Sequence, residues 1–370
     1  MSSLEESDAL HARVRAFARH SLSGAATESF DALAADIARF QAAHIPGFRR
    51  LVDAHGTSLS DAASIPAVPV DAFRLARVAV HPPEQDDARF VTSGTTSGAP
   101  GTHALRTTST YRELSLAWAI PGLLCDESPR VVVALAPDPG DVITSSLAFM
   151  MRALMETLDG RSLGDGTAAR FDVDAKARWL VGPGGPDVVG IARAVAVARE
   201  RREPLLVLAT SFALVLLADA TDQRFEAPEG SVVMTTGGFK GKSREIAPAA
   251  LVERVAWQFG VPAPRIIGEY GMTELTSQLY EHPPERGVFH PPPWLRVTPV
   301  DPETLAPVPP GEKGIARFVD LGNVDSAVAI VTQDLVRATG TGVELFGRRP
   351  GAPPRGCSLA IEEMVLGSAG

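Results

Sequence analysis

A repeating pattern from Arg130 onward constrains the fold more than any other feature of the sequence. Short apolar runs rich in β-branched residues alternate with stretches whose apolar residues have helical spacing. Strand, helix, strand in this order predicts a parallel sheet and therefore an α/β fold. Each predicted strand runs into a turn rich in Gly or Thr, and ligands of such sheets bind at the carboxyl ends of the strands. The predicted strands are VVVALAP after Arg130, Leu205 to Thr210, Ser231 to Gly238 and Arg265 to Gly271, and the predicted helices are Ser145 to Leu158, Asp187 to Glu200 and Ala247 to Phe259.

The chain on either side of this pattern has a different character. Residues 4–52 have apolar residues at helical spacing and predict a helical lead-in whose end is marked by Pro46 and Gly47. Two prolines within residues 64–74 predict an extended connecting segment. After Gly287 the sequence becomes Pro-rich with short apolar runs, which indicates a β-rich subdomain. We therefore expect a helical lead-in over 1–60, an α/β core over 61–286, the β-rich subdomain over 287–345, and a hinge with a truncated tail over 346–370.

Composition excludes several classes of protein. The 370 residues are 45% hydrophobic and 21% charged, the balance of a soluble globular protein. A formal net charge of −9 argues against a nucleic-acid-binding surface and favours a small-molecule partner. The N-terminus lacks the apolar core of a secretory signal, and the most apolar stretch, Pro204 to Ala220, is too short to span a bilayer. We interpret that stretch as a buried strand, a turn and a buried helix, and we expect a cytoplasmic protein without a membrane span.

Cysteine and histidine usage gives no sign of a metal bound by the protein alone. The two cysteines, Cys125 and Cys357, lie far apart and form neither a disulfide framework nor a metal-ligand pattern. The eight histidines are scattered without zinc-binding spacing. Any metal is therefore expected to arrive with a nucleotide.

The segment Thr92 to Gly101 is a loop of small residues that follows a short apolar run. Its glycines free the backbone to present N–H groups, and its hydroxyls add further donors, which suits the β- and γ-phosphates of ATP. It is not a Walker A loop, and the alternative is a flexible surface loop. Besides Thr92, the predicted phosphate-binding residues are Ser93, Gly94, Thr95, Thr96, Ser97 and Gly98.

A second motif, Gly268 to Glu274, directly follows the last predicted buried strand, so its side chains should emerge at the ligand-binding edge. Tyr270 offers a face for adenine, Thr273 a hydroxyl for the α-phosphate, and Glu274 a carboxylate for Mg²⁺, which prefers oxygen ligands shared with phosphate. The alternative is a helix N-terminus with Thr273 as its cap.

The two motifs together resemble the adenylate-forming superfamily, which includes acyl-CoA ligases, luciferases and the adenylation domains of peptide synthetases. The phosphate loop of that superfamily reads Thr-Ser-Gly-Thr-Thr-Gly-x-Pro-Lys-Gly, and its later motif reads Tyr-Gly-x-Thr-Glu. Here Ser97 is inserted or substituted, and the usual Lys is missing, since Gly101, Thr102 and His103 follow Pro100. This departure points to a subfamily and removes one cation from the phosphate site.

Further matches narrow the resemblance to the acyl-protein synthetases of the bacterial luciferase (lux) fatty-acid reductase complex and their relatives, over most of residues 60–360. The matching segments are Ile65-Pro66 to Phe73-Arg74, Thr236 to Gly241, and the run from Asp301-Pro-Glu-Thr304 to Gly347-Arg348. The resemblance implies that Asp334 holds the ribose hydroxyls, although a plain turn residue is the alternative. Lys240 is a candidate to contact a substrate carboxylate or phosphate, with a solvated surface lysine as the alternative. The nucleotide-contacting set implied by the resemblance is Gly237, Gly238, Glu269, Tyr270, Gly271, Asp334 and Arg348.

The C-terminal segment carries one more expectation of the resemblance. Arg355-Gly356-Cys357 is similar to the superfamily's hinge, after which a mobile domain normally supplies a catalytic lysine, whereas only 13 residues follow Cys357 here. We expect that domain to be absent or vestigial. The lux synthetases carry the acyl group on a cysteine near the C-terminus, and we hypothesise that Cys357 receives it as a thioester, with arginines nearby to lower the pKa of the thiol. The alternative is a small buried apolar cysteine.

The sequence therefore predicts an ATP- and Mg²⁺-dependent ligase that converts a carboxylic acid to an acyl-adenylate and passes the acyl group to a thiol. Thr273, Glu274, Lys240 and Cys357 are the predicted catalytic residues, with Glu274 also the metal ligand. A fatty acid follows from the resemblance alone, and the expected partner is an acyl acceptor or donor protein such as a reductase or carrier. Two alternatives remain open: a weakly active or non-catalytic nucleotide- or acyl-binding subunit of a reductase complex, and a ligase that transfers the acyl group to CoA or an amine.

Overall fold

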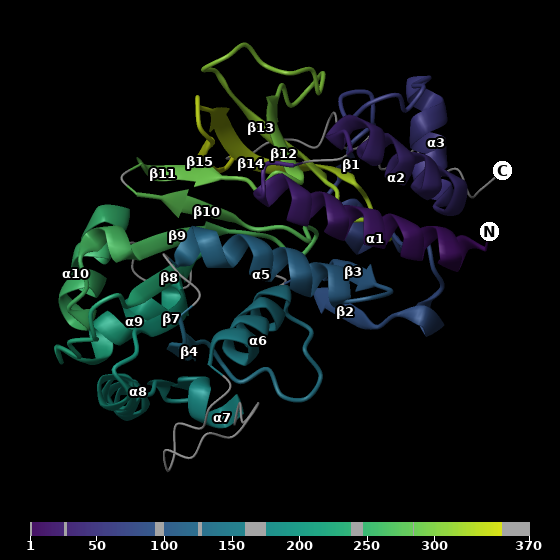
Figure 1. Ribbon diagram of the computed structural model, residues 1–370. Coiled ribbons are helices and arrows are strands. Elements are labelled where there is room, and N and C mark those ends of the chain that lie inside the picture. The colour runs from purple at the N-terminus through teal and green to yellow at the C-terminus, as the bar shows by residue number, and fades with distance from the viewer. Residues whose placement is uncertain are drawn as a thin grey trace. The chain divides into compact units, whose positions relative to one another are not determined.

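The computed structural model describes residues 2–25, 28–92, 100–124, 128–159, 175–237, 247–283 and 285–349 (Figure 1). The chain divides into two units, and each contains segments that are distant in sequence. Unit 1 comprises Met1–Ala117, Met272–Leu279 and Gly287–Gly370, and unit 2 comprises Trp118–Gly271 and Tyr280–Arg286. Among the helices that the structure describes, none combines the length and the apolar character needed to cross a membrane.

Unit 2 is built on a parallel sheet, as the repeating pattern predicts. Strands β4, β7, β8 and β9 pair in parallel in that order, and β10 is the next strand after β9. The strands are β4 (Val131–Leu135), β7 (Leu205–Thr210), β8 (Val232–Thr236), β9 (Ile266–Tyr270) and β10 (Leu279–His282). The main helices are α6 (Ser146–Leu158), α8 (Val188–Arg201), α9 (Ser211–Ala220) and α10 (Pro248–Phe259). The short elements are α7 (Ala175–Arg178), β5 (Val181–Gly182), β6 (Gly185–Pro186) and η2 (Ala263–Arg265).

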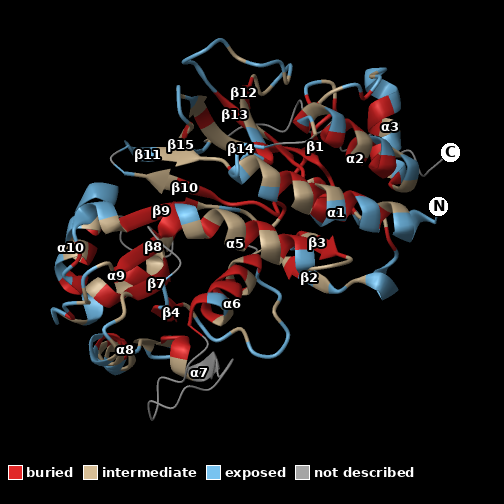
Figure 2. Cartoon of the chain, viewed as in Figure 1, coloured by how far each residue is buried: buried red, intermediate tan, exposed pale blue. Residues whose placement is uncertain are grey.

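Burial explains why the strands of unit 2 read as continuous apolar runs. All five residues of β4 are buried, as are the first five of β7, and Figure 2 shows these strands in red. A strand in a parallel sheet covered on both faces has no solvent-facing side that would impose polar alternation. Helices α8, α9 and α10 contribute their apolar residues to the same core cluster as these strands. The predicted strands and helices of this unit are therefore confirmed to within a few residues at each end.

The junction of β7 and α9 differs from the predicted strand, turn and helix. The strand runs directly into the helix, because Thr210 is both the last residue of β7 and the N-cap of α9. Its hydroxyl accepts a hydrogen bond from the Ala213 N–H at 3.1 Å. A threonine with extended backbone geometry satisfies an unpaired helix donor without a separate turn.

Unit 1 combines helices with a largely antiparallel sheet. Its strands pair in the order β12, β13, β14, β15, β11, and the short β1 joins β14 in parallel. The expected β-rich character after Gly287 is confirmed. The strands are β1 (Val68–Pro69), β2 (Ala88–Val91), β3 (Thr102–Leu105), β11 (Glu285–His290), β12 (Leu295–Val300), β13 (Lys313–Asp320), β14 (Ala329–Ala338) and β15 (Val343–Arg348). The helical elements are α1 (Ser3–Leu22), α2 (Phe30–His44), α3 (Pro46–His55), α4 (Ala72–Leu75) and η1 (Pro83–Gln85).

Two features of the helices were not predicted. Pro46 does not end the helical lead-in: it occupies the first turn of α3, where its missing N–H would have no intrahelical partner anyway. The lead-in ends instead after His55, at Gly56, whose φ of 59° is the left-handed geometry that favours glycine. The sequence pattern also gave no sign of α5 (Ser109–Leu123), which contains Pro121 near its end.

Candidate active site

The ends of the predicted phosphate loop are fixed by an antiparallel pair of strands in unit 1. Strands β2 and β3 pair with Val91 opposite Thr102. At the base of the loop, the Thr92 N–H donates to the Gly101 carbonyl at 2.9 Å, and the Gly101 N–H donates to the Thr92 hydroxyl at 2.8 Å. Thr92 thus closes the loop through its backbone and its side chain. Six of the residues predicted to bind phosphate lie outside the described residues: Ser93, Gly94, Thr95, Thr96, Ser97 and Gly98.

The second motif forms an irregular turn, not a helix. Thr273 and Glu274 occupy this turn, so the alternative of a helix capped by Thr273 is wrong. Residues outside this turn hold its backbone in place. Asn323 Nδ2 donates to the Glu274 carbonyl at 2.9 Å, and the carboxylate of Asp320 accepts from the N–H groups of residues 276 and 277, each at 2.9 Å. Because both partners are buried, the backbone that carries Thr273 and Glu274 has little freedom to move.

His103 also contacts this turn, although the sequence gave no reason to select it. Its Nδ1 lies 2.8 Å from the Thr273 carbonyl, and its Nε2 lies 2.8 Å from the Ser326 hydroxyl. The side chain is fully buried, and burial lowers the pKa of His103 to about 4. The sequence separation of 170 residues between His103 and Thr273 explains why no local pattern reveals the contact.

Glu274 is the buried carboxyl of this turn, with 7% of its surface exposed. Burial raises the pKa of Glu274 to about 7, Arg348 opposes this shift, and Asp334 adds to it. Asp334 and Arg348 are opposite each other on β14 and β15, with 3.9 Å between Arg348 Nε and Asp334 Oδ1. The structure therefore brings Glu274, Asp334 and Arg348 within electrostatic reach of one another.

Glu274 also fits the predicted role in holding Mg²⁺. A buried carboxyl with a raised pKa lacks sufficient positive charge around it, and a divalent cation shared with phosphate would favour its ionised form. No group of three or more His, Cys, Asp or Glu side chains in the described part of the chain is arranged to hold a metal ion. The donor set thus suits a cation that brings most of its oxygen ligands with it.

The remaining described site residues belong to unit 2, at the carboxyl ends of β8 and β9. Thr236 and Glu269 are paired across these strands, and the Thr236 hydroxyl donates to the Glu269 carboxyl. Glu269 is 5% exposed, and burial raises its pKa to about 7. Tyr270 ends β9 and is partly buried, and Gly237, with a φ of 75°, follows β8. The parallel sheet thereby places these residues at the edge where α/β sheets bind ligands.

The unit boundary passes through the second motif, between Gly271 and Met272. Thr92, Thr273, Glu274, Asp334 and Arg348 belong to unit 1, whereas Gly237, Glu269, Tyr270 and Gly271 belong to unit 2. Gly238, Lys240 and Cys357 lie outside the described residues, so their predicted roles stay predictions.

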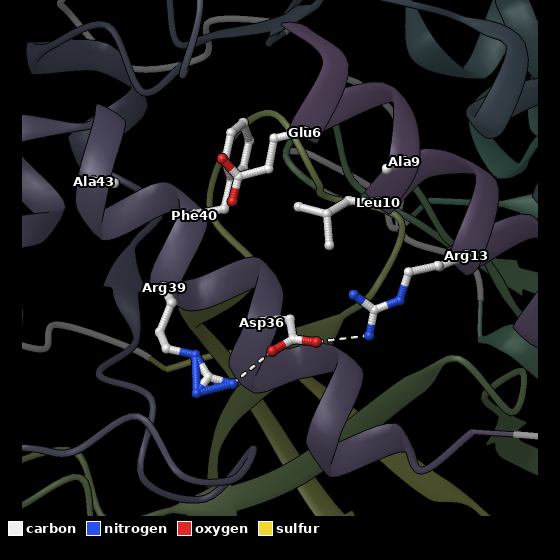
Figure 3. A pocket seen from close by; sticks show the side chains of 8 residues that line it. All are labelled: Glu6, Ala9, Leu10, Arg13, Asp36, Arg39, Phe40 and Ala43. Carbon is white, nitrogen blue, oxygen red and sulfur yellow. Dashed lines mark hydrogen bonds and ion pairs between the residues drawn. The ribbon is translucent and has the colours of Figure 1, made fainter. Parts of the chain in front are cut away.

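A separate hollow of about 280 Å³ lies between α1 and α2 of unit 1 (Figure 3). Its two arginines both pair with Asp36, each at 2.6 Å: Arg13 across the hollow and Arg39 within α2. None of the candidate site residues lines this hollow.

Part of this chain is similar in sequence to known acyl-protein synthetases. Residues 188–366 match the family model described as acyl-protein synthetase, LuxE. The long-chain-fatty-acid–luciferin-component ligase of Vibrio harveyi is 25% identical over 38% of this chain and 39% of its own length. The enzyme of the same name from Aliivibrio fischeri is 30% identical over 26% of this chain and 27% of its own length. The matched segments thus span well under half of either relative.

The fold is that of a solved CoA ligase. A structure of 2-hydroxyisobutyryl-CoA ligase with 2-HIB-AMP and CoA superposes with a TM-score of 0.57 at 16% identity, covering 85% of this chain and 73% of that one. A post-adenylation structure of the same ligase gives 0.59 at 15% identity, covering 94% and 69%. The resemblance inferred from the sequence is supported: residues 188–366 are similar to the LuxE acyl-protein synthetase family, and the chain has the fold of 2-hydroxyisobutyryl-CoA ligase.

Proposed function

We propose that this chain uses ATP to convert a carboxylic acid to an acyl-adenylate and then transfers the acyl group to a thiol. The observation that carries the proposal is the buried Glu274 in a rigid turn beside Thr273, with Asp334 and Arg348 within electrostatic reach. The relatives' names support a long-chain fatty acid as substrate. A reductase or carrier protein that exchanges the acyl group, and a cytoplasmic location, are parts of the same proposal.

In the first step, an oxygen of the substrate carboxylate attacks the α-phosphorus of ATP. A P–O bond forms as the bond to pyrophosphate breaks, and pyrophosphate leaves with its electron pair. The Thr273 hydroxyl donates to the α-phosphate, and Asp334 accepts from the ribose hydroxyls, with Arg348 beside it. Glu274 would hold Mg²⁺, which neutralises the charge that develops on the phosphates when it is bound. The contribution of the chain is mainly positioning and charge stabilisation.

The loop of residues 92–101 is proposed to hold the departing pyrophosphate, and Lys240 to contact the substrate carboxylate or a phosphate. In the second step, a thiolate attacks the acyl carbon, a C–S bond forms, and AMP leaves. Cys357 is the proposed acceptor within this chain, since a thiolate is a good nucleophile toward an acyl-adenylate.

The first step is tested by pyrophosphate release with Mg-ATP and a panel of acids that includes long-chain fatty acids and aryl acids. We expect release with at least one acid and a loss on the order of 10²-fold in Glu274→Gln, because one charge-stabilising group is removed. Glu253→Gln, an exposed glutamate on α10, is the matched control and should match the unmodified chain. Silence with every acid would favour a nucleotide- or acyl-binding subunit over a ligase.

The second step is tested with a labelled acid. Incubation with Mg-ATP should give protein-bound label that hydroxylamine removes, and Cys357→Ala should lose it. Cys125→Ala, the other cysteine of the chain, should keep it. Equal labelling of both variants would reject Cys357 as the acceptor and leave the first step untouched.

A further inference from the structure

We infer that His103 is a positioning residue for adenylation: it ties the strand that leaves the phosphate loop to the carbonyl of Thr273. This inference rests on the proposed function and adds a residue that neither motif contains. All of its contacts lie within unit 1. The residue stands in β3, two positions after Gly101, whose N–H is bonded to Thr92 at the base of the loop.

The hydrogen bonds of His103 define its protonation. A carbonyl oxygen only accepts, so the proton that lies between His103 and Thr273 is on Nδ1. The Ser326 hydroxyl then donates to the bare Nε2, and the ring is neutral. Burial that lowers the pKa of His103 to about 4 agrees with a neutral ring at neutral pH. The ring of Phe73 packs edge-on against it, 5.7 Å between centroids, which fixes the plane of the imidazole.

This arrangement makes one residue a bridge between the two halves of the proposed site. Strand β3 carries His103 and begins directly after Gly101. The N–H of Gly101 closes the base of the loop by donating to the Thr92 hydroxyl. The carbonyl that His103 holds belongs to Thr273, whose hydroxyl is proposed to contact the α-phosphate. Displacement of that carbonyl therefore moves the Thr273 hydroxyl relative to Thr92 and Gly101, at the base of the proposed phosphate loop.

The partner on the far side of the ring is itself held. Ser326 follows Asp325, a buried carboxylate that accepts from the Ser7 hydroxyl at 2.6 Å and lies 2.7 Å from His11 Nε2. Both of these residues are on α1, so the imidazole is braced by a helix and not by a solvent-exposed loop. Because the segment that carries Ser326 is held in place, Ser326 can hold the imidazole in a fixed position, as a positioning role requires.

The test compares two substitutions of the same side chain. His103→Leu fills the space and removes the donor, whereas His103→Asn keeps an N–H donor near the place of Nδ1. We expect His103→Leu to lower kcat/KM for ATP by roughly 10- to 100-fold in the pyrophosphate assay, mainly through kcat, because small misplacements of reacting groups cost about this much. His103→Asn should recover most of the loss, a rescue that a purely volume-filling role would not show.

The control is His44→Leu. His44 is a partly buried histidine of α2 in unit 1, and its Nδ1 lies 2.9 Å from the Phe40 carbonyl of its own helix. We expect its kcat/KM to stay near that of the unmodified chain, whatever its melting temperature. If His103→Leu does not fold, Ser326→Ala replaces it: it removes the hydroxyl bonded to Nε2 without changing the ring, and a loss of several-fold is expected.

The outcomes separate this inference from the proposed function. An unmodified chain that releases pyrophosphate, together with unchanged kcat/KM in His103→Leu or its substitute Ser326→Ala, overturns only the positioning role. A loss in His44→Leu as large as that in His103→Leu overturns it as well, because the effect would then not depend on contact with the turn. Silence of the unmodified chain with every acid overturns both.

Discussion

The buried carboxyl of Glu269 should make the stability of unit 2 depend on pH. Burial raises the pKa of Glu269 from 4.5 to about 7, so the folded protein binds this proton more tightly than the unfolded chain does. Stability from this group is then fully present below about pH 4.5 and is lost as the pH rises through about 7. Glu269→Gln keeps an acceptor for the Thr236 hydroxyl and cannot ionise, so it should abolish this loss.

The size of the effect follows from the shift. At about 1.4 kcal/mol for each pKa unit, the change from 4.5 to about 7 corresponds to about 3 kcal/mol at alkaline pH. Thermal denaturation of a unit of this size moves by roughly 2–4 °C per kcal/mol. We therefore expect Glu269→Gln to melt roughly 6–12 °C above the unmodified chain at pH 8.5 and within about 3 °C of it at pH 5.

The assay is circular dichroism melting of both proteins between pH 5 and 9. Glu274 has a similarly raised pKa, but it is present in both proteins and cancels in the difference. Glu253→Gln, exposed on α10, should give no pH-dependent difference. The reasoning is refuted if the two curves of melting temperature against pH run parallel, since Glu269 would then be ionised in the fold without cost.

Three further changes have outcomes fixed by single contacts. Thr210→Ala removes the cap that accepts from the Ala213 N–H and should lower the free energy of unfolding by about 1 kcal/mol, measured by urea denaturation. Arg178→Leu removes the nearer of two arginines that pair with the buried carboxylate of Asp159, the other being Arg201 at 3.7 Å, and should lower the free energy of unfolding by about 3 kcal/mol; the double variant Arg178→Leu/Asp159→Leu should recover part of this loss. Asp320→Ala removes the acceptor of several buried donors and should lower both the melting temperature and the rate of pyrophosphate release, each donor left unpaired costing about 1–3 kcal/mol.

The elements of the fold that the sequence predicted are those with a strong local signal. The strands of unit 2 are buried on both faces, and such strands are continuous runs of apolar residues that need no tertiary information to recognise. Pro46 misled the prediction because proline both ends helices and begins them, and the neighbouring sequence does not distinguish the two. Helix α5 was missed because its first turns interleave polar with apolar residues and its last turn contains a proline.

The residues of the candidate site that the sequence predicted also have a strong local signal, and those that it missed do not. The loop at 92–101 and the motif at 268–274 were found because each is a short run of unusual composition. Asn323 and Asp320, which hold the turn, belong to no such run: each is one polar residue that meets its partners only when β13 and the segment after it fold against the turn. Such long-range hydrogen bonds are a consequence of the fold, so a single sequence read locally does not reveal them.

The helical lead-in now has a physical role that its sequence did not suggest. Gln41 of α2 is fully buried, and its amide donates to the carbonyls of Asn323 and Val324 at 2.6 and 3.0 Å, while its oxygen accepts from the Val328 N–H at 3.0 Å. A buried amide with three good partners is costly to disturb. The segment that holds the Glu274 carbonyl through Asn323 is thus fixed by α2, as its neighbour Asp325 is by α1. Amphipathic spacing alone marks a helix that packs, but these polar contacts connect the lead-in to the chemistry proposed for the turn.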